Sequence, residues 1–139
     1  MAGLRKILLV EDDVMIRELY RAKLIEAQYT VEVAGSAPEL YNKLLDYRPD
    51  CLLLDVMLPG VSGLEILKEL RTNPEKGCQD AKIIILTNLA QRSVTDSAIE
   101  GGADGFVLKT DILPKDLPMI ISSLEDDTEE VPSDITADS

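Results

Sequence analysis

Five short apolar segments, alternating with stretches of helical spacing, constrain the fold of this chain more than any other feature of its sequence. The segments occupy residues 6–10, 30–34, 51–54, 82–86 and 105–108. Three of them are apolar nearly throughout, as parallel strands covered on both faces usually are. The alternation predicts an α/β fold in which five βα units form one open parallel sheet with helices on both faces.

The helical stretches are marked by apolar stripes and by boundary signals. One stripe comprises Ile16, Leu19, Tyr20, Leu24 and Ala27, and the last comprises Leu117, Ile120, Ile121 and Leu124. Capping boxes at residues 36–39 and 62–65 predict the starts of the second and third helices. Asn73-Pro74 and Gly101-Gly102 predict the ends of the third and fourth.

Composition excludes several classes of function. Histidine is absent, which rules out Ser-His-Asp and Cys-His catalysis, histidine-ligated metals and a phosphohistidine formed by this chain. The 26 acidic residues outnumber the 14 basic ones, and the net charge of −12 argues against direct binding to nucleic acid. No apolar run approaches the ~18 residues that a transmembrane helix needs, and the N-terminus lacks a signal-peptide pattern. We therefore expect a cytoplasmic protein that does not span a membrane.

The two cysteines, Cys51 and Cys78, show no metal-binding or redox spacing. We expect both to be reduced thiols, with Cys51 packed as a small hydrophobic side chain.

Acidic residues are concentrated at the end of the chain. Residues 125–139 hold seven acids and no base, which leaves residues 1–124 with a net charge of −5. This division predicts a folded domain over 1–124 and a disordered tail or linker stump over 125–139, with an acidic docking segment as the alternative.

Polar side chains follow four of the predicted strands. In open parallel sheets the ligand site lies beyond the carboxyl ends of the strands, where we expect these side chains to meet. They are Glu11, Asp12, Asp13, Asp55, Thr87 and Lys109. Clustered carboxylates repel one another unless a cation is present, and a donor set of oxygens alone favours Mg²⁺. A carboxylate beside Mg²⁺ can accept a phosphoryl group, whose oxygens suit a hydroxyl and an ammonium. The alternative, a set of unrelated solvated charges, is disfavoured because four strand ends carry complementary groups.

The motifs at these strand ends identify a resemblance. In their order and spacing over residues 4–124, these motifs resemble those of the receiver domain of two-component response regulators. They are KILLVEDD, LLLDVMLPGVSG, IIILT and GADGFVLK. The resemblance implies a flavodoxin-like (βα)5 three-layer sandwich with strand order 2-1-3-4-5.

The resemblance also implies roles for individual residues. Asp55 matches the phosphoacceptor, and Glu11 and Asp12 match the acidic pair, with Asp12 as the expected direct Mg²⁺ ligand. Met57 would offer its backbone carbonyl to the metal. Asp13, one place later, is expected to cap the first helix instead.

Three further residues match the family's switch. Thr87 matches the switch hydroxyl, Lys109 the lysine that pairs with the acyl phosphate, and Phe106 the switch aromatic. Core packing is the alternative role for Phe106, the only phenylalanine. The implied function is phosphoryl transfer from a sensor histidine kinase or phosphotransfer protein to Asp55. The switched face, formed by the fourth helix, fifth strand and fifth helix, would then act on a downstream protein. The domain would also hydrolyse its own acyl phosphate, and would be a switch rather than a metabolic enzyme.

The chain departs from the family's commonest pattern at several positions. Thr110 follows Lys109 where a cis proline is usual, so we predict a trans bond. Asn88 replaces a small residue beside Thr87, where it would obstruct a phosphodonor or form a hydrogen bond. Met57 and Leu89 cannot orient an attacking water, which predicts slow loss of the phosphoryl group.

Rival interpretations come from other classes. A haloacid dehalogenase-type phosphatase would need a second aspartate where Met57 stands, and a flavin carrier would need a hydroxyl-rich loop where Glu11, Asp12 and Asp13 stand. A pseudo-receiver scaffold is a further alternative. Because the receiver motifs begin near Met1, we expect a stand-alone receiver or the N-terminal fragment of a longer regulator. Residues that select the kinase are expected on the first helix, over 16–27.

Overall fold

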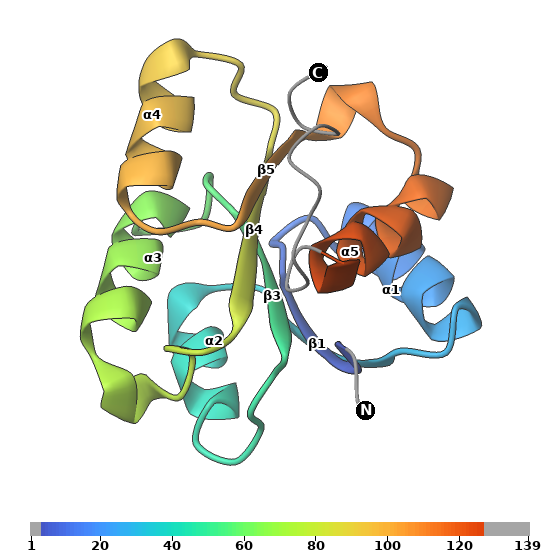
Figure 1. Ribbon diagram of the computed structural model, residues 1–139, viewed down its shortest axis with the longest axis horizontal. Helices are drawn as coiled ribbons and strands as arrows, with labels where there is room; N and C mark the ends of the chain where they lie inside the picture. The colour runs from blue at the N-terminus through green and yellow to red at the C-terminus, as the bar shows by residue number, and fades with distance from the viewer. Residues whose placement is uncertain (1–3, 127–139) are drawn as a thin grey trace.

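The computed structural model of the chain describes residues 4–126. Five strands form one parallel sheet in the order β2-β1-β3-β4-β5 (Figure 1). They are β1 (Lys6–Val10), β2 (Thr30–Ala34), β3 (Cys51–Asp55), β4 (Lys82–Thr87) and β5 (Gly105–Leu108). The predicted α/β fold, strand order and strand positions are confirmed, and β3 and β4 each extend one residue further than expected.

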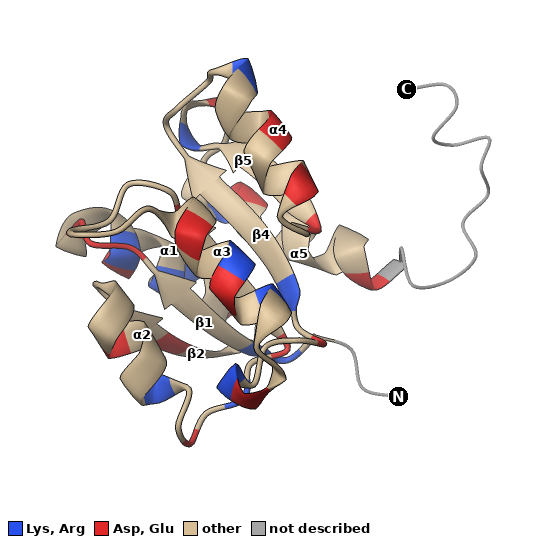
Figure 2. Ribbon diagram, turned by 90° about the vertical axis from the view of Figure 1, so that its left-hand side faces the viewer, with Lys and Arg blue, Asp and Glu red and all other residues tan. Residues whose placement is uncertain are grey.

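Five α-helices cover the two faces of this sheet. They are α1 (Val14–Glu26), α2 (Ala37–Lys43), α3 (Gly63–Thr72), α4 (Arg92–Glu100) and α5 (Leu117–Asp126). Helices α1 and α5 lie on one face, and α2, α3 and α4 on the other (Figure 1). Charged residues lie along α3 and α4 (Figure 2). Exposed charged residues of these helices include Glu65, Lys68, Asp96 and Glu100. The result is the expected three-layer sandwich.

Each face of the sheet has its own hydrophobic core, because successive strand side chains point to opposite faces. In β3, Leu52 and Leu54 pack with α2, α3 and α4, whereas Cys51 and Leu53 pack with α1 and α5. All five residues of β3 are buried, which explains why this strand reads as a continuous apolar run.

The helix boundaries follow local chemistry. Asp13 caps α1 by accepting the Ile16 N–H at 3.1 Å, as predicted. Ser36 caps α2 by accepting the Glu39 N–H, but the Glu39 carboxylate accepts the N–H of Gly35 instead of that of Ser36, so the first predicted capping box is formed only in part. Ser62 caps α3 by accepting the N–H of Leu64 rather than that of Glu65, so the second capping box is not formed as predicted. Helices α3 and α4 end at the expected signals.

The buried face of α1 is narrower than the predicted stripe. Tyr20 and Leu24 are buried, but Leu19 is 52% exposed and Ala27 is also exposed. Assigning those two residues to the stripe was therefore wrong. Helix α1 packs against the sheet, α5 and the 3₁₀ turn at Pro114–Asp116. Its exposed side also presents Val14 and Met15.

Arg71, in the last turn of α3, joins this helix to the turn between α4 and β5. Its guanidinium donates to the Gly102 carbonyl at 2.9 Å and forms an ion pair with Asp104 at 2.7 Å. It also donates to three carbonyls of residues 78–81. One side chain thus fixes the C-terminal end of α4 relative to α3.

Both cysteines are free and fully buried, as expected for packed thiols. Burial raises the pKa of the Cys51 thiol, and raises that of Cys78 to about 11.

Helix α5 continues to Asp126. The Glu125 carboxylate accepts the Leu4 N–H at 2.8 Å, which ties the end of α5 to the segment before β1. The first two residues of the predicted tail are therefore helical, and the rest of that tail lies outside the described residues. Over residues 4–126, no helix is long and apolar enough to cross a membrane.

Candidate functional site

The predicted site residues meet at the carboxyl edge of the sheet. Glu11 follows β1, Asp55 and Thr87 end β3 and β4, and Lys109 follows β5. Parallel pairing of β3 with β4 and of β4 with β5 holds these positions side by side. Glu11, Asp55 and Thr87 are almost completely buried, and the Lys109 side chain is only 7% exposed.

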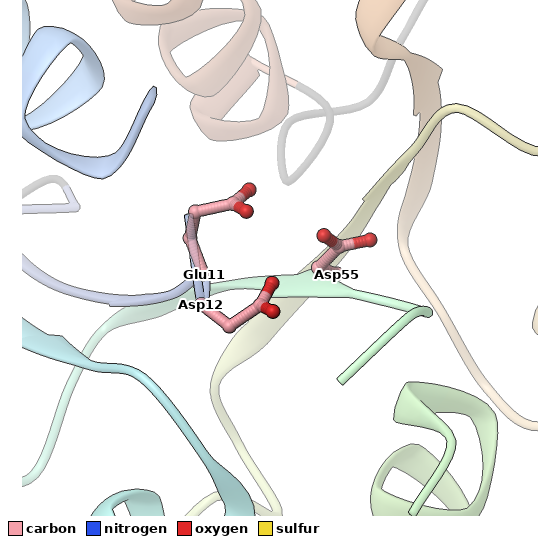
Figure 3. A group of neighbouring side chains, drawn as sticks. All are labelled: Glu11, Asp12 and Asp55. Carbon is pink, nitrogen blue, oxygen red and sulfur yellow. The ribbon is translucent and has the colours of Figure 1, made fainter. Parts of the chain in front are cut away.

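Three carboxylates form an acidic group at this edge. Oxygens of Glu11, Asp12 and Asp55 lie within 4.8 Å of one another, and the side chains of the first two extend toward the side of Asp55 (Figure 3). Asp13 caps α1 and does not belong to this group. A set of carboxylate oxygens without nitrogen or sulfur suits a hard cation such as Mg²⁺.

Lys109 connects two of these carboxylates. Its ammonium donates to Glu11 Oε1 and, at 2.7 Å, to Asp55 Oδ2. Burial alone would lower the pKa of Lys109, but the bonds to Asp55 and Glu11 outweigh it and raise that pKa. Burial also raises the pKa of Glu11, an effect that the Lys109 ammonium only partly offsets. The site therefore holds its lysine firmly in the charged form.

Glu11 has a protein partner for each of its polar groups. Besides Lys109, its carboxylate accepts the Asp13 N–H at 3.1 Å. Its backbone N–H donates to the Ala34 carbonyl at 2.9 Å, and its carbonyl accepts a bond from Arg17 at 3.2 Å. Asp12 is exposed, and its carboxylate accepts no hydrogen bond from residues 4–126. Glu11 is thus fixed in place, while Asp12 is open to a ligand.

Asp55 is oriented from two sides. Its Oδ2 accepts from Lys109, and its Oδ1 accepts the backbone N–H of Met57 at 3.1 Å. The Met57 side chain is 58% exposed, so this residue serves the site through its backbone.

Thr87 and its neighbours form the rim of the site next to α4. The Thr87 hydroxyl is fully buried and accepts the Leu89 N–H at 3.1 Å, which leaves its own proton for another acceptor. Asn88 is exposed. Phe106 is half-buried and packs against the core beneath α2, α3 and α4, in keeping with a packing role.

Residues 7–131 match the response regulator receiver domain family. This chain belongs to that family, whose members act in two-component systems. Response regulator MprA of Mycobacterium avium is 35% identical over 141 residues, an alignment that covers 96% of this chain and 60% of MprA. The chain therefore spans about 60% of the length of this curated relative.

Solved structures agree with this assignment. A CheY-like receiver domain protein of Methanospirillum hungatei JF-1 has 28% identity and a TM-score of 0.78, covering 90% of this chain and 96% of that one. Chemotaxis response regulator CheY4 of Vibrio cholerae has 27% identity and a TM-score of 0.77, covering 86% and 98%.

The receiver domain contains no cis peptide bond over residues 4–126, so the Lys109–Thr110 bond is trans, as predicted. Residues Lys109–Asp111 form a 3₁₀ turn directly after β5. The lysine reaches both carboxylates from the start of this turn.

Two residues of the receiver site were missed by sequence reasoning. A Cβ at Gly63 would lie 2.0 Å from the Asp55 carbonyl oxygen, so only glycine lets α3 begin against the end of β3. A glycine directly after the capping Ser62, where a better helix former would be expected, was an available signal. Arg17 was missed because an arginine on a half-exposed helix is ordinary.

Proposed function

We propose that this receiver domain accepts a phosphoryl group on Asp55 from a phosphohistidine of a sensor kinase or phosphotransfer protein. The observation that carries the proposal is the juxtaposition of a buried, lysine-bound Asp55 with Thr87 and with two further carboxylates. Each of these groups can take part in phosphoryl transfer. Unrelated charges at the strand ends would not be expected to gather in one complementary cluster.

The acidic group suits Mg²⁺. Asp12, Asp55 and the Met57 carbonyl are the proposed ligands, and Glu11 supports them from its fixed position. When bound, the cation supplies positive charge that offsets the charge on the phosphoryl oxygens during transfer.

The protein's own groups perform the remaining work. One Asp55 oxygen bonds to phosphorus while the phosphorus–nitrogen bond to the donor histidine breaks, and the electron pair of that bond returns to the imidazole nitrogen. The Lys109 ammonium holds the Asp55 carboxylate in place beforehand and pairs with a phosphoryl oxygen afterwards. The Thr87 hydroxyl donates its free proton to another phosphoryl oxygen.

Phosphorylation would then act as a switch. Movement of Thr87 toward the phosphoryl group weakens its contact with the Leu89 N–H, and Phe106 follows into the space released. The face of α4, β5 and α5 would change its affinity for a downstream protein. The kinase would dock on α1, which follows the acidic loop (residues 11–13) and exposes Val14, Met15 and Leu19. We place this exchange in the cytoplasm, without direct contact to nucleic acid or membrane.

The first test is phosphorylation by acetyl phosphate with Mg²⁺, followed by intact-mass spectrometry. We expect one phosphoryl group on the wild type and none on Asp55→Asn. Because Met57 and Leu89 cannot orient water, we expect the adduct to persist for minutes or longer after the donor is removed. An unmodified wild type that also shows no NMR shifts with beryllofluoride would favour the pseudo-receiver scaffold. Loss of the adduct within seconds would contradict the slow hydrolysis alone.

A further inference from the structure

Arg17 contacts the backbone of the acidic loop, whereas Lys109 contacts its Glu11 side chain. It lies in the second turn of α1, and its Nη1 donates to the Glu11 carbonyl at 3.2 Å. The side chain is 18% exposed. Its Nε is buried, has no hydrogen-bond partner over residues 4–126, and lies 4.0 Å from a Glu18 oxygen. Burial of an incompletely paired guanidinium is unfavourable, so this placement calls for a compensating role.

The turn between β2 and α2 makes room for this guanidinium. A Cβ at Gly35 would lie 2.9 Å from Arg17 Nη1 and 3.5 Å from a Glu39 oxygen. The Gly35 N–H donates to that same Glu39 oxygen at 2.7 Å. The arginine therefore occupies a gap bounded by α1, the acidic loop and the Gly35 turn, a gap that a side chain at Gly35 would close.

The bond to the Glu11 carbonyl acts on Asp12. This carbonyl belongs to the peptide group that joins Glu11 to Asp12, and the N–H on the other side of Glu11 is held by Ala34. With both ends of Glu11 held, rotation of the Glu11–Asp12 peptide is restricted. The exposed Asp12 carboxylate accepts no hydrogen bond from residues 4–126 that would direct it, so its direction depends on this peptide.

We propose that Arg17 is a positioning residue for the divalent-cation site, acting through the Glu11 carbonyl to aim the Asp12 carboxylate toward Asp55. This inference rests on the proposed function. The role proposed for Arg17 and its charge alone predict opposite effects on Mg²⁺ affinity when Arg17 is replaced. By charge alone, a guanidinium near the site repels a divalent cation, so its removal should strengthen Mg²⁺ binding. If Arg17 positions Asp12, its removal weakens binding.

The test is an NMR titration of the full chain with Mg²⁺. Arg17→Met keeps the aliphatic stem and removes the donor, whereas Arg17→Lys keeps a charge and one donor group. Arg21→Met is the matched control, because Arg21 lies one turn further along α1 and, among residues 4–126, pairs with Glu18 alone. We expect Mg²⁺ affinity to fall about tenfold in Arg17→Met, as for other residues that orient metal ligands, to recover in part in Arg17→Lys, and to stay unchanged in the control.

A second readout needs no metal. The Asp12 amide nitrogen shares its peptide group with the Glu11 carbonyl, so its ¹⁵N shift should change in metal-free Arg17→Met and not in Arg21→Met. If Arg17→Met does not fold, Gly35→Ala displaces the guanidinium and should give the same two changes. Equal or tighter Mg²⁺ binding by the folded variant would overturn the inference. Absence of Mg²⁺ binding by the wild type would instead overturn the proposed function, and the ¹⁵N shift would still decide whether Arg17 orients the loop.

Discussion

Lys109 is the residue on which the site's charge balance depends. One ammonium faces two buried carboxylates, Glu11 and Asp55, and both bonds are made at once. The sequence predicted which residues would meet, because each ends or follows a strand of one sheet. It did not predict that Lys109 bridges two acids, since this depends on the turn after β5 and on side-chain rotamers. Arg17 escaped prediction for a similar reason, because its partner is a backbone carbonyl rather than a complementary side chain.

Removal of the Lys109 charge should destabilise the metal-free protein. Lys109→Met leaves Glu11 and Asp55 buried without their cation, and breaking such a buried pair costs on the order of 3 kcal/mol. Chemical denaturation at neutral pH measures this loss. Lys115→Met, at an exposed position, is the control and should change the free energy of unfolding by less than about 0.5 kcal/mol. Equal stability of the two variants would show that the bridge contributes nothing net.

At the scale of elements, the limits of helices and strands follow from signals in the chain, but the width of a buried face does not. The periodicity of α1 correctly placed Tyr20 and Leu24 in the core, yet it also assigned Leu19 to the buried side. Helical spacing alone does not reveal how many neighbours a helix has. Helix α3 shows a second limit of periodicity. Its first residue, Gly63, fits only as glycine, and the spacing of apolar residues does not reveal this.

The start of α3 should tolerate no side chain at Gly63. Gly63→Ala would place a carbon against the Asp55 carbonyl, forcing α3 and the end of β3 apart at a cost of about 1–3 kcal/mol. Because Asp55 moves with its backbone, we also expect slower phosphorylation by acetyl phosphate. Gly105→Ala is the matched control, since its Cβ would meet Ile84 at an ordinary 3.5 Å. A Gly63→Ala protein as stable and as reactive as this control would contradict the close approach.

At the scale of the whole molecule, the two edges of the sheet have different roles. The carboxyl edge holds the acidic group, whereas the opposite edge is joined by structural contacts, such as the bond from Leu4 to Glu125. The chain therefore continues past Asp126 from the edge remote from Asp55. The layered α/β architecture was predicted from the order of the apolar segments, whereas the strand order was predicted from the resemblance to receiver domains.

A hydrogen bond at the amino ends of the strands leads to a prediction about stability at alkaline pH. The Tyr47 hydroxyl donates to the carbonyls of Ile7 and Thr30, and burial, followed by the charges of Glu32 and Asp50, raises its pKa from 10.0 to about 12. A raised pKa in the folded state means that the neutral phenol stabilises the fold. This stabilisation is complete below pH 10 and is lost as the pH rises toward 12.

Tyr47→Phe tests this linkage. We expect the variant to lose about 1 kcal/mol of stability at pH 8 through its missing hydrogen bonds. Between pH 10 and 12 its stability should fall less than that of the wild type. Urea denaturation at several pH values compares the two. Parallel pH curves would mean that Tyr47 does not titrate differently in the folded state.

The burial of both cysteines has a practical consequence for testing the proposed switch. Thiolates, not thiols, react with maleimides and iodoacetamides, and these two thiols are enclosed and hard to ionise. A cysteine introduced on the surface, such as Ser97→Cys on α4, should therefore be labelled selectively while Cys51 and Cys78 stay in place. Paired with a second label on α1, it would let fluorescence energy transfer test in real time whether α4 moves on phosphorylation, in a protein whose two cores keep every native side chain.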